Sequence, residues 1–247
     1  MLGSAAEGAR TISGNGIVDV LRRPRISLLR RLGLALLVLL FLPVPVIVLY
    51  RFVPPPVTPL MLIRAAEGEP MHREWVAYAR IAPALPRAVI ASEDTRFCWH
   101  HGFDWIEIDK AWDAYQTGDR LRGASTISQQ LARNLFLWPG GGYPRKAAEA
   151  YITVLLEAML SKERILELYL NVVEWGDGVY GAEAAARAHF GRHAAQLSPR
   201  EAALLAAVLP APQEWRPEHP TRFLDERADT ILARMPEVAV PGRGGCR

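Results

Sequence analysis

The stretch from Ala88 to Asp104, AVIASEDTRFCWHHGFD, carries the residue types that acid–base chemistry uses. Its apolar start predicts a helix that presents two adjacent acids, Glu93 and Asp94. On one continuous helix Glu93, Phe97 and His100 would share a face, because side chains spaced i, i+4 and i+7 align. A carboxylate between an aromatic ring and an imidazole is a candidate general base. The alternative is a surface helix whose acids have no chemical role.

A second polar stretch, GASTISQQLARN from Gly123 to Asn134, has seven hydrogen-bonding side chains, and six of them align on one predicted helix. The spacing arranges them in two adjacent rows on that helix. Neutral hydroxyls and amides suit a sugar, and an arginine beside them suits a phosphate. An ordinary solvated face remains open as the alternative, although such faces more often use Glu and Lys. The rows are Ser125, Gln129, Arg133 and Thr126, Gln130, Asn134.

A third stretch, RKAAEAYITVLLE, begins at Arg145 and predicts a mostly apolar helix with a polar residue at every fourth position. A carboxylate buried on such a helix costs several kcal/mol unless it has a partner. Arg145 and Glu149 could form a structural ion pair at helical spacing. Alternatively, Arg145 and Lys146 could form an anion site with Glu149 beside it, and both interpretations are compatible.

Together these parts match glycosyl transfer from a donor whose leaving group is a pyrophosphate. Glu93 would take the proton of an acceptor hydroxyl, a contribution typically of about 10²–10⁴-fold. Arg133, Arg145 and Lys146 would neutralise the leaving pyrophosphate. The chain has no Asp-x-Asp and no Rossmann glycine pattern, which argues against a nucleotide-sugar transferase.

The elements that must position these residues are predicted to be helices throughout, in one all-α domain. No convincing alternation of period two occurs in the chain. Helix starts are indicated at Ser125, at Ser161 and at Ser198, where Glu201 completes a capping-box pattern. The predicted helices cover residues 74–81, 84–96, 104–117, 125–137, 145–160, 162–174, 178–190, 198–209 and 222–234.

The N-terminal part predicts a membrane anchor. Residues 32–50 contain no charge and would span about 28 Å as a helix, close to the thickness of a bilayer core. Five arginines lie before this run and only Arg51 directly follows it, which predicts a single pass with the N-terminus in the cytoplasm. A cleaved signal peptide is the alternative. Around the anchor we expect a disordered tail (1–31), a stiff proline-rich spacer (51–70), the catalytic domain (71–236) and a flexible tail (237–247).

Composition sets further bounds. A chain of 247 residues with 50% hydrophobic content can bury one good-sized core. The net charge of +3 is concentrated in the arginines before the anchor, so no nucleic-acid partner is expected. Cys98 lies in the first polar stretch and Cys246 in a glycine-rich tail, so we expect no structural disulfide between them. No cysteine–histidine spacing typical of a metal site occurs, so no metal site is predicted.

Taken in chain order, these motifs resemble the peptidoglycan glycosyltransferase family. This family comprises the monofunctional biosynthetic transglycosylases and the transglycosylase module of class A penicillin-binding proteins. The similarity extends from about Pro83 to Pro212. The motifs are Glu93-Asp94-x-x-Phe97-x-x-His100-x-Gly102, Gly123-x-Ser-Thr-Ile-x-Gln-Gln-x-x-Arg-Asn134, Arg145-Lys-x-x-Glu149 and the segment from Gly181 to Gly191.

The resemblance implies a lysozyme-like helical fold and lipid II as the substrate, joined by β-1,4 bonds with inversion and release of undecaprenyl pyrophosphate. It places the catalytic glutamate at Glu93 and a second essential glutamate at Glu149. Arg133 occupies a position that is often lysine in the family, so its contact geometry can differ. The substrate-binding positions would be Asp94, Phe97, His100, Ser125, Thr126, Gln129, Gln130, Arg133, Asn134, Arg145 and Lys146.

The resemblance also implies an enzyme of the bacterial inner membrane with its catalytic domain in the periplasm. It requires no cofactor, although Mg²⁺ or Mn²⁺ could assist through the substrate pyrophosphate, and other cell-wall synthesis proteins are candidate partners. Transpeptidase motifs Ser-x-x-Lys and Lys-Thr-Gly are absent, which predicts a monofunctional enzyme. Two alternatives stay open: a lysozyme-like hydrolase or lytic transglycosylase, and an inactive anchored scaffold. The basic residues argue against the first, and the retention of both glutamates argues against the second.

Overall fold

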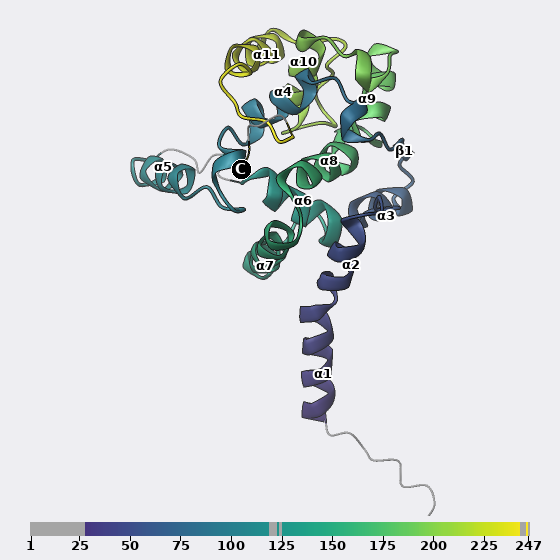
Figure 1. Ribbon diagram of the computed structural model, residues 1–247, viewed down its shortest axis with the longest axis vertical. Helices are drawn as coiled ribbons and strands as arrows, with labels where there is room; N and C mark the ends of the chain where they lie inside the picture. The colour runs from purple at the N-terminus through teal and green to yellow at the C-terminus, as the bar shows by residue number, and fades with distance from the viewer. Residues whose placement is uncertain (1–27, 119–122, 124, 243–245, 247) are drawn as a thin grey trace, which may run out of the picture. The chain divides into compact units, whose positions relative to one another are not determined.

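A computed structural model describes residues 28–118, 123, 125–242 and 246, and these are mostly helical (Figure 1). The chain divides into two compact units, residues 1–42 and residues 43–247. Of the first unit the structure describes helix α1 (Leu28–Phe41), and most of the predicted disordered tail lies outside the described residues. Every other element belongs to the second unit.

The predicted membrane helix is divided into two elements. Helix α1 ends at Phe41 and helix α2 (Pro43–Tyr50) begins two residues later. Pro43 lies in the first turn of α2, where a missing N–H costs nothing, whereas in a continuous helix it would lose a hydrogen bond and clash with the preceding turn. Among the residues that the structure describes, no helix is both long enough and apolar enough to cross a membrane.

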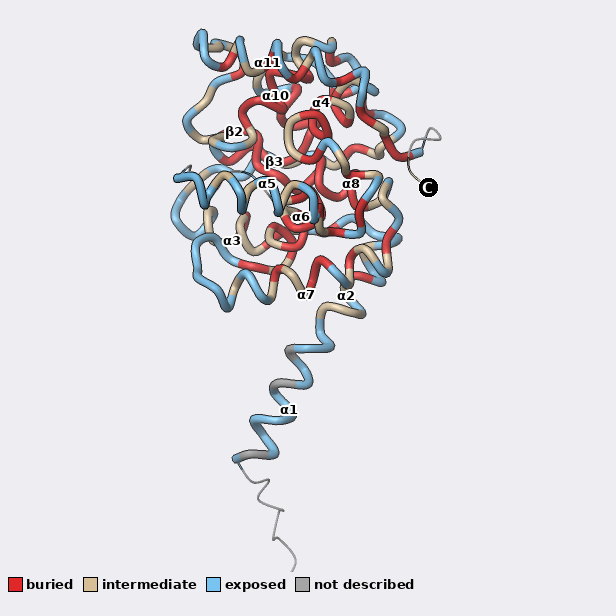
Figure 2. The backbone as a smooth tube through the Cα atoms, turned by 90° about the vertical axis from the view of Figure 1, so that its left-hand side faces the viewer, coloured by how far each residue is buried: buried red, intermediate tan, exposed pale blue. Residues whose placement is uncertain are grey.

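Helices build the core of the second unit. Helix α10 packs against α4 and α11, and α6 packs against α7 and α8. Figure 2 shows the buried backbone concentrated along α4, α6, α8 and α10. The second unit's helices are α2 and α3 (Pro59–Ala66), α4 (Ala84–Glu93), α5 (Trp105–Gln116), α6 (Ile127–Phe136), α7 (Tyr143–Met159), α8 (Lys162–Val172), α9 (Ala182–Phe190), α10 (Pro199–Val208) and α11 (Arg222–Arg234), with short 3-10 helices η1 (Tyr78–Arg80), η2 (Phe97–Trp99) and η3 (Ala194–Gln196).

A small sheet corrects the all-helical prediction. Strand β3 (Val179–Tyr180) lies between β1 (His72–Arg73), which is parallel to it, and β2 (Glu174–Gly176), which is antiparallel. Strands of two or three residues are too short to show an alternating pattern in sequence. The helix predicted over 178–190 begins only at Ala182, after β3, and the helix predicted over 74–81 is wrong apart from the 3-10 helix at Tyr78–Arg80.

Two of the predicted helix starts are confirmed. The Ser161 hydroxyl accepts a hydrogen bond from the Arg164 N–H at the start of α8. Ser198 and Glu201 form a complete capping box at the start of α10. The third differs by one residue, because Thr126 rather than Ser125 is the N-cap of α6.

The predicted proline-rich spacer is held against the domain rather than extended away from it. Arg164 Nε donates to the Tyr50 carbonyl at 2.8 Å, and its Nη2 donates to the Val53 carbonyl at 3.1 Å. The Arg73 guanidinium donates to the carbonyls of Pro55 and Pro56. Helix α3, which the sequence did not predict, forms within this segment and contacts α6.

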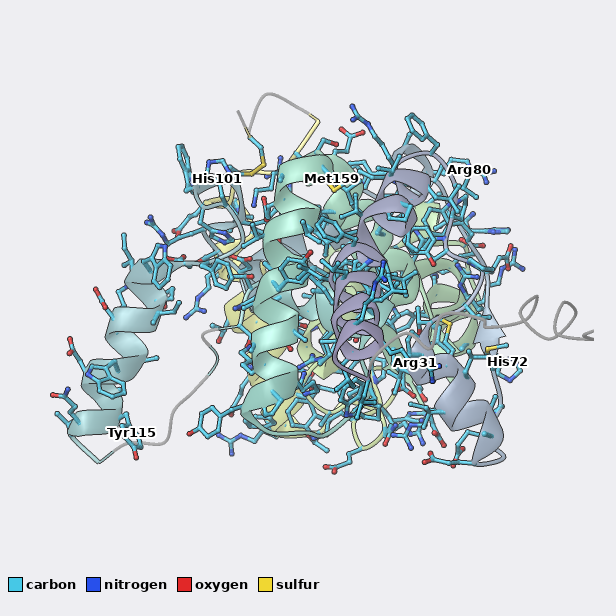
Figure 3. All side chains as sticks on the ribbon, turned by 90° about the horizontal axis from the view of Figure 1, so that it is seen from below. Arg31, His72, Arg80, His101, Tyr115 and Met159 are labelled. Carbon is cyan, nitrogen blue, oxygen red and sulfur yellow. A yellow bond between two sulfur atoms is a disulfide. The ribbon has the colours of Figure 1, made fainter. Side chains whose placement is uncertain are left out.

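The predicted absence of a disulfide is wrong. Cys98 and Cys246, 148 residues apart, are bonded through their sulfur atoms (yellow bond, Figure 3). Val238 and Val240 are buried, so residues 237–242 pack on the domain instead of forming a free tail. The position of a cysteine in a glycine-rich terminal segment does not reveal that the chain returns to an earlier element.

Glu183 on α9 makes folding stability depend on pH. Burial by itself raises the pKa of this carboxyl, but hydrogen bonds from the Ala194 N–H, His193 and Arg187 outweigh burial and lower its pKa below the ordinary value. An acid with a lowered folded-state pKa adds stability above its unfolded-state pKa, and this stability is lost as the pH falls through the folded value.

Glu183→Gln is therefore expected to cost about 2 kcal/mol of unfolding free energy at pH 7, because the amide loses charge-assisted hydrogen bonds. The cost should shrink as the pH is lowered below about 4.5, where the unfolded carboxyl becomes protonated. Denaturant titrations of both proteins between pH 7 and pH 3 measure the difference. An equal cost at every pH would contradict this role of the charge.

Candidate active site

Glu93 is the last residue of α4, and the chain leaves the helix immediately after it. Asp94 has φ −162° and ψ 72°, and Phe97–Trp99 forms a separate 3-10 helix. The predicted helix over 84–96 is therefore too long, and Glu93 does not share a helical face with Phe97 and His100. The physical reason is tertiary: Asp94 Oδ2 accepts a hydrogen bond from the Ile127 N–H at 3.0 Å, which ties the end of α4 to the start of α6.

It is Asp94, not Glu93, that faces the imidazole. His100 Nδ1 accepts a hydrogen bond from the Gly102 N–H at 3.1 Å, so the proton of a neutral ring lies on Nε2. That nitrogen donates to Asp94 Oδ1 at 2.8 Å, and both side chains are buried. Asp94 and His100 thus fix the loop that follows Glu93, which is a positioning role.

Gly102 and Phe97 complete this buried loop. Gly102 has φ +92°, and a Cβ at this position would lie only 2.7 Å from Thr153 Cγ2, so a side chain does not fit. The Gly102 carbonyl accepts a hydrogen bond from Thr126 Oγ1 at 2.7 Å. Phe97 is fully buried, with the Lys162 ammonium 4.4 Å from the centre of its ring.

Both oxygens of the Glu93 carboxylate have hydrogen-bond donors. Gln130 Nε2 donates to Oε2 at 3.0 Å, and the Ser92 hydroxyl donates to Oε1 at 3.0 Å. The Tyr169 hydroxyl in turn donates to Gln130 Oε1 at 2.9 Å, which fixes the orientation of the amide. Burial, with the neighbouring Glu93 charge, raises the pKa of Tyr169 well above its usual value, so the phenol remains a donor.

A cleft opens beside this carboxylate. Its volume is about 170 Å³, and its lining includes Glu93, Asp94, Ser125 and Thr126. A second cavity of about 340 Å³, lined largely by α11, shares Ala91, Ser92 and Arg234 with the first. Glu93 is thus accessible from a groove in which a substrate hydroxyl could reach it.

A cluster of charges lies at the start of α7. The Glu149 carboxylate is 2% exposed, and Arg145 Nη1 donates to its Oε2 at 2.8 Å. Lys146 Nζ bonds the other oxygen of Glu149 and lies 3.5 Å from Ser125 Oγ on the wall of the cleft. The structural ion pair predicted from i, i+4 spacing is therefore confirmed, and the half-exposed side chain of Lys146 in the same cluster contacts a residue of the cleft wall.

Some residues of the predicted polar face of α6 are buried in the domain, and others lie at the cleft. Thr126 and Gln129 are buried and form a capping box, in which each side-chain oxygen accepts a hydrogen bond from the other residue's N–H. Ser125 precedes the helix and lines the cleft, and Gln130 binds Glu93.

Two further members of the predicted face lie nearer the C-terminal half of α6. Asn134 is buried. Arg133 is half-buried, and its charge acts on Tyr169, where it opposes the rise of the phenol pKa. Of the residues that the spacing placed on this face, only some reach open space.

Asp94, His100 and Asp104 bring three potential metal-ligand atoms within 4.8 Å of one another, a cluster that the sequence spacing did not predict. Each group already has protein partners. Asp104 Oδ1 accepts from the N–H groups of Ile106 and Glu107, and its Oδ2 lies 3.1 Å from Arg96 Nε. The contacts are those of a structural hydrogen-bond network, and they do not require an ion.

The residues at the site that were missed in the sequence include Ser92, Tyr169, Arg227 and Arg234. Tyr169 lies on α8, an amphipathic helix whose sequence predicts only a structural role. The two arginines lie on α11, more than 130 positions after Glu93. Only the place of Ser92 directly before Glu93 offered a signal. The others reach the site through the packing of α8 and α11.

A solvent-accessible glutamate held by an amide and a hydroxyl, with cations on a neighbouring helix, defines a site suited to acid–base-assisted glycosyl transfer. Comparison with known proteins agrees with this class, since residues 61–236 match the transglycosylase family. The chain belongs to that family and is an enzyme. The match begins ten residues before the predicted domain start and includes α3.

Curated relatives cover nearly the whole chain. A protein of Rhodospirillum centenum named biosynthetic peptidoglycan transglycosylase is 54% identical over 220 residues, which is 89% of this chain and 95% of the relative. Proteins with the same name are 49% identical in Caulobacter vibrioides, over 89% of this chain and 96% of the relative, and in Stutzerimonas stutzeri, over 86% and 90%. The resemblance of the motifs to this family is confirmed.

Proposed function

We propose that this protein, a peptidoglycan glycosyltransferase by its family, polymerises lipid II into β-1,4-linked glycan strands with inversion at the donor sugar. The observation that carries the proposal is the environment of Glu93. Its carboxylate is fixed by Ser92 and Gln130 at the edge of a cleft, and the ammonium of Lys146 lies 3.5 Å from Ser125 Oγ, a residue of the cleft wall. A base for an acceptor hydroxyl thus lines the cleft, and a cation for a phosphate contacts a residue of its wall.

In the proposed reaction, Glu93 takes the proton of the acceptor 4-hydroxyl as that oxygen attacks the anomeric carbon of the donor. The bond from this carbon to the pyrophosphate breaks, and its electron pair leaves with undecaprenyl pyrophosphate. Arg133, Arg145 and Lys146 stabilise the charge that develops on the leaving group. No cofactor is needed, and a divalent ion such as Mg²⁺ or Mn²⁺ would act through the substrate's own pyrophosphate oxygens.

Within this proposal, the remaining site residues divide by what they contact. Ser125 and Gln130 would meet the substrate directly, since they line the cleft or bind Glu93. Others would act mainly by holding backbone and helix ends, as their hydrogen bonds and burial indicate, and two of these, Asp94 and Thr126, also line the cleft: Asp94, Phe97, His100, Thr126, Gln129 and Asn134. A lysozyme-like architecture, which the resemblance implies, is part of the same proposal.

We further propose a single-pass anchor in the inner membrane formed by residues 32–50, with the domain in the periplasm, where lipid II is polymerised. The uncharged run and the arginines before it support this orientation. Helix α5 projects from the other helices of the domain (Figures 1 and 3), and it carries the exposed aromatic side chains of Trp105, Trp112 and Tyr115. Tryptophan and tyrosine favour the membrane–water interface, and the further exposed ones outside α5 are Trp99, Trp138 and Tyr143.

The test is polymerisation of lipid II by the purified full-length protein in detergent. We expect glycan polymers and released undecaprenyl pyrophosphate, measured by gel separation of labelled product and by phosphate release after phosphatase treatment. Intact sacculi serve as the second substrate, and digestion of sacculi without polymer formation would support a hydrolase. If the protein neither polymerises lipid II nor digests sacculi, the result would support an inactive scaffold.

A further inference from the structure

Helix α11 places an arginine against the end of α4. Arg227 Nε donates to the Ala207 carbonyl on α10 at 3.2 Å, and its Nη2 donates to the Ser92 hydroxyl at 3.3 Å. The same Nη2 lies 3.9 Å from Oε1 of Glu93. Figure 1 shows α4, α10 and α11 side by side, in agreement with their contacts.

The hydroxyl of Ser92 has two acceptors but only one proton. Glu93 Oε1 lies 3.0 Å from it and the Ala206 carbonyl lies 3.3 Å from it. Because Arg227 donates to the oxygen of Ser92, the arginine uses a lone pair and leaves the single proton for one of these two acceptors. The positive charge of Arg227 holds the carboxylate on this side, so the proton is directed to Glu93 rather than to the neutral carbonyl.

We propose that Arg227 is a positioning residue for Glu93, acting through the hydroxyl of Ser92 and through its own charge; this inference rests on Glu93 being the base. Gln130 holds one carboxylate oxygen from α6, and the Arg227–Ser92 pair holds the other from α11. With both oxygens fixed, the carboxylate keeps one orientation toward the cleft. A misplacement of a reacting group by about 1 Å can cost as much as 10²-fold in rate.

The guanidinium shape is essential to this arrangement. Its planar fork donates to the Ala207 carbonyl and to Ser92 with different nitrogens. A lysine has a single ammonium and would keep the charge but not both contacts. Arg227→Lys is therefore expected to restore part of the function that Arg227→Gln removes.

The experiment measures kcat and KM for lipid II in Arg227→Gln, Arg227→Lys and Ser92→Ala, with Arg200→Gln as the matched control. Arg200 also joins α10 to α11, through Asp225 and Asp229, but has no contact with Glu93. We expect Arg227→Gln to lower kcat about ten-fold with KM changed less than two-fold, since orientation rather than binding is lost. Arg227→Lys should fall between it and the native enzyme, and the control should keep native kcat.

The double variant Ser92→Ala/Arg227→Gln tests whether Arg227 acts on Glu93 through the hydroxyl of Ser92. Because both residues act on the same oxygen of Glu93, its kcat should be close to that of Arg227→Gln alone instead of the product of the two losses. Independent losses, or equal kcat in Arg227→Gln and Arg200→Gln, would overturn the positioning role. If Arg227→Gln does not fold, Arg227→Lys and Ser92→Ala decide by the same criteria. Undiminished activity of Glu93→Gln would instead overturn the assignment of the base, so the two failures are distinguishable.

Discussion

Glu93→Gln is expected to lower polymerisation of lipid II by at least about 100-fold, because an amide cannot take the proton of the acceptor hydroxyl. The fold should be unaffected. The glutamine oxygen can accept from Gln130 Nε2, and its amide can donate to the Ser92 hydroxyl, so the neighbours of the carboxylate keep their partners. Initial rates with purified lipid II, together with thermal unfolding of both proteins, measure the two effects.

The matched control is Glu226→Gln. This carboxylate lines the cavity next to the cleft but is exposed and pairs with Arg222. The same chemical change should leave the rate within about two-fold, as is usual for exposed ion pairs without a contact to the site. A Glu93→Gln enzyme that polymerises as well as this control would show that another group is the base.

Arg145→Ala is expected to lower both stability and activity. The rate per folded molecule decides whether Arg145 is only part of an ion pair or also contacts the pyrophosphate. Glu149 is almost fully buried, and the substitution leaves its carboxylate with Lys146 as its one cationic partner among the described residues. Removing one partner of a buried pair should cost about 3 kcal/mol of unfolding free energy. If Arg145 also faces the pyrophosphate, the rate per folded molecule should fall by at least about ten-fold, with the larger effect on donor use.

Arg222→Ala provides the comparison for stability. Arg222 and Glu226 form an ion pair with the same i, i+4 spacing, but both side chains are mostly exposed. Its loss should cost less than about 1 kcal/mol, because surface pairs contribute little. A normal rate per folded molecule in Arg145→Ala, despite a lower melting temperature, would make the ion pair purely structural.

Local spacing was sufficient where the contact lies within one element. The i, i+4 relation of Arg145 and Glu149 became an ion pair, and Ser161 and Ser198 became helix caps, because both depend on the geometry of a single helix. The motif residues also identified the family, which the relatives confirm.

Residue spacing gave wrong predictions where a side chain contacts a segment that is distant in the sequence. Asp94 lies outside the helix because its carboxylate accepts hydrogen bonds from the Ile127 N–H and from the His100 imidazole. A helix that continued through Asp94 would not allow these contacts. Cys98 forms a disulfide with Cys246 because residues 237–242 pack against the domain. Neither event follows from a local pattern, since each depends on the path of chain far away.

The stretch from Ala88 to Asp104 shows both sides of this division. The sequence by itself determined that a helix, two acids and an imidazole occur within this stretch, since residue types and helical propensity are local properties. Only the tertiary structure decided which acid meets which partner. Asp94 turns inward to His100, while Glu93 turns to Gln130, Ser92 and the Arg227 charge. Those partners come from α6 and α11, whose positions are set by the packing of the whole core.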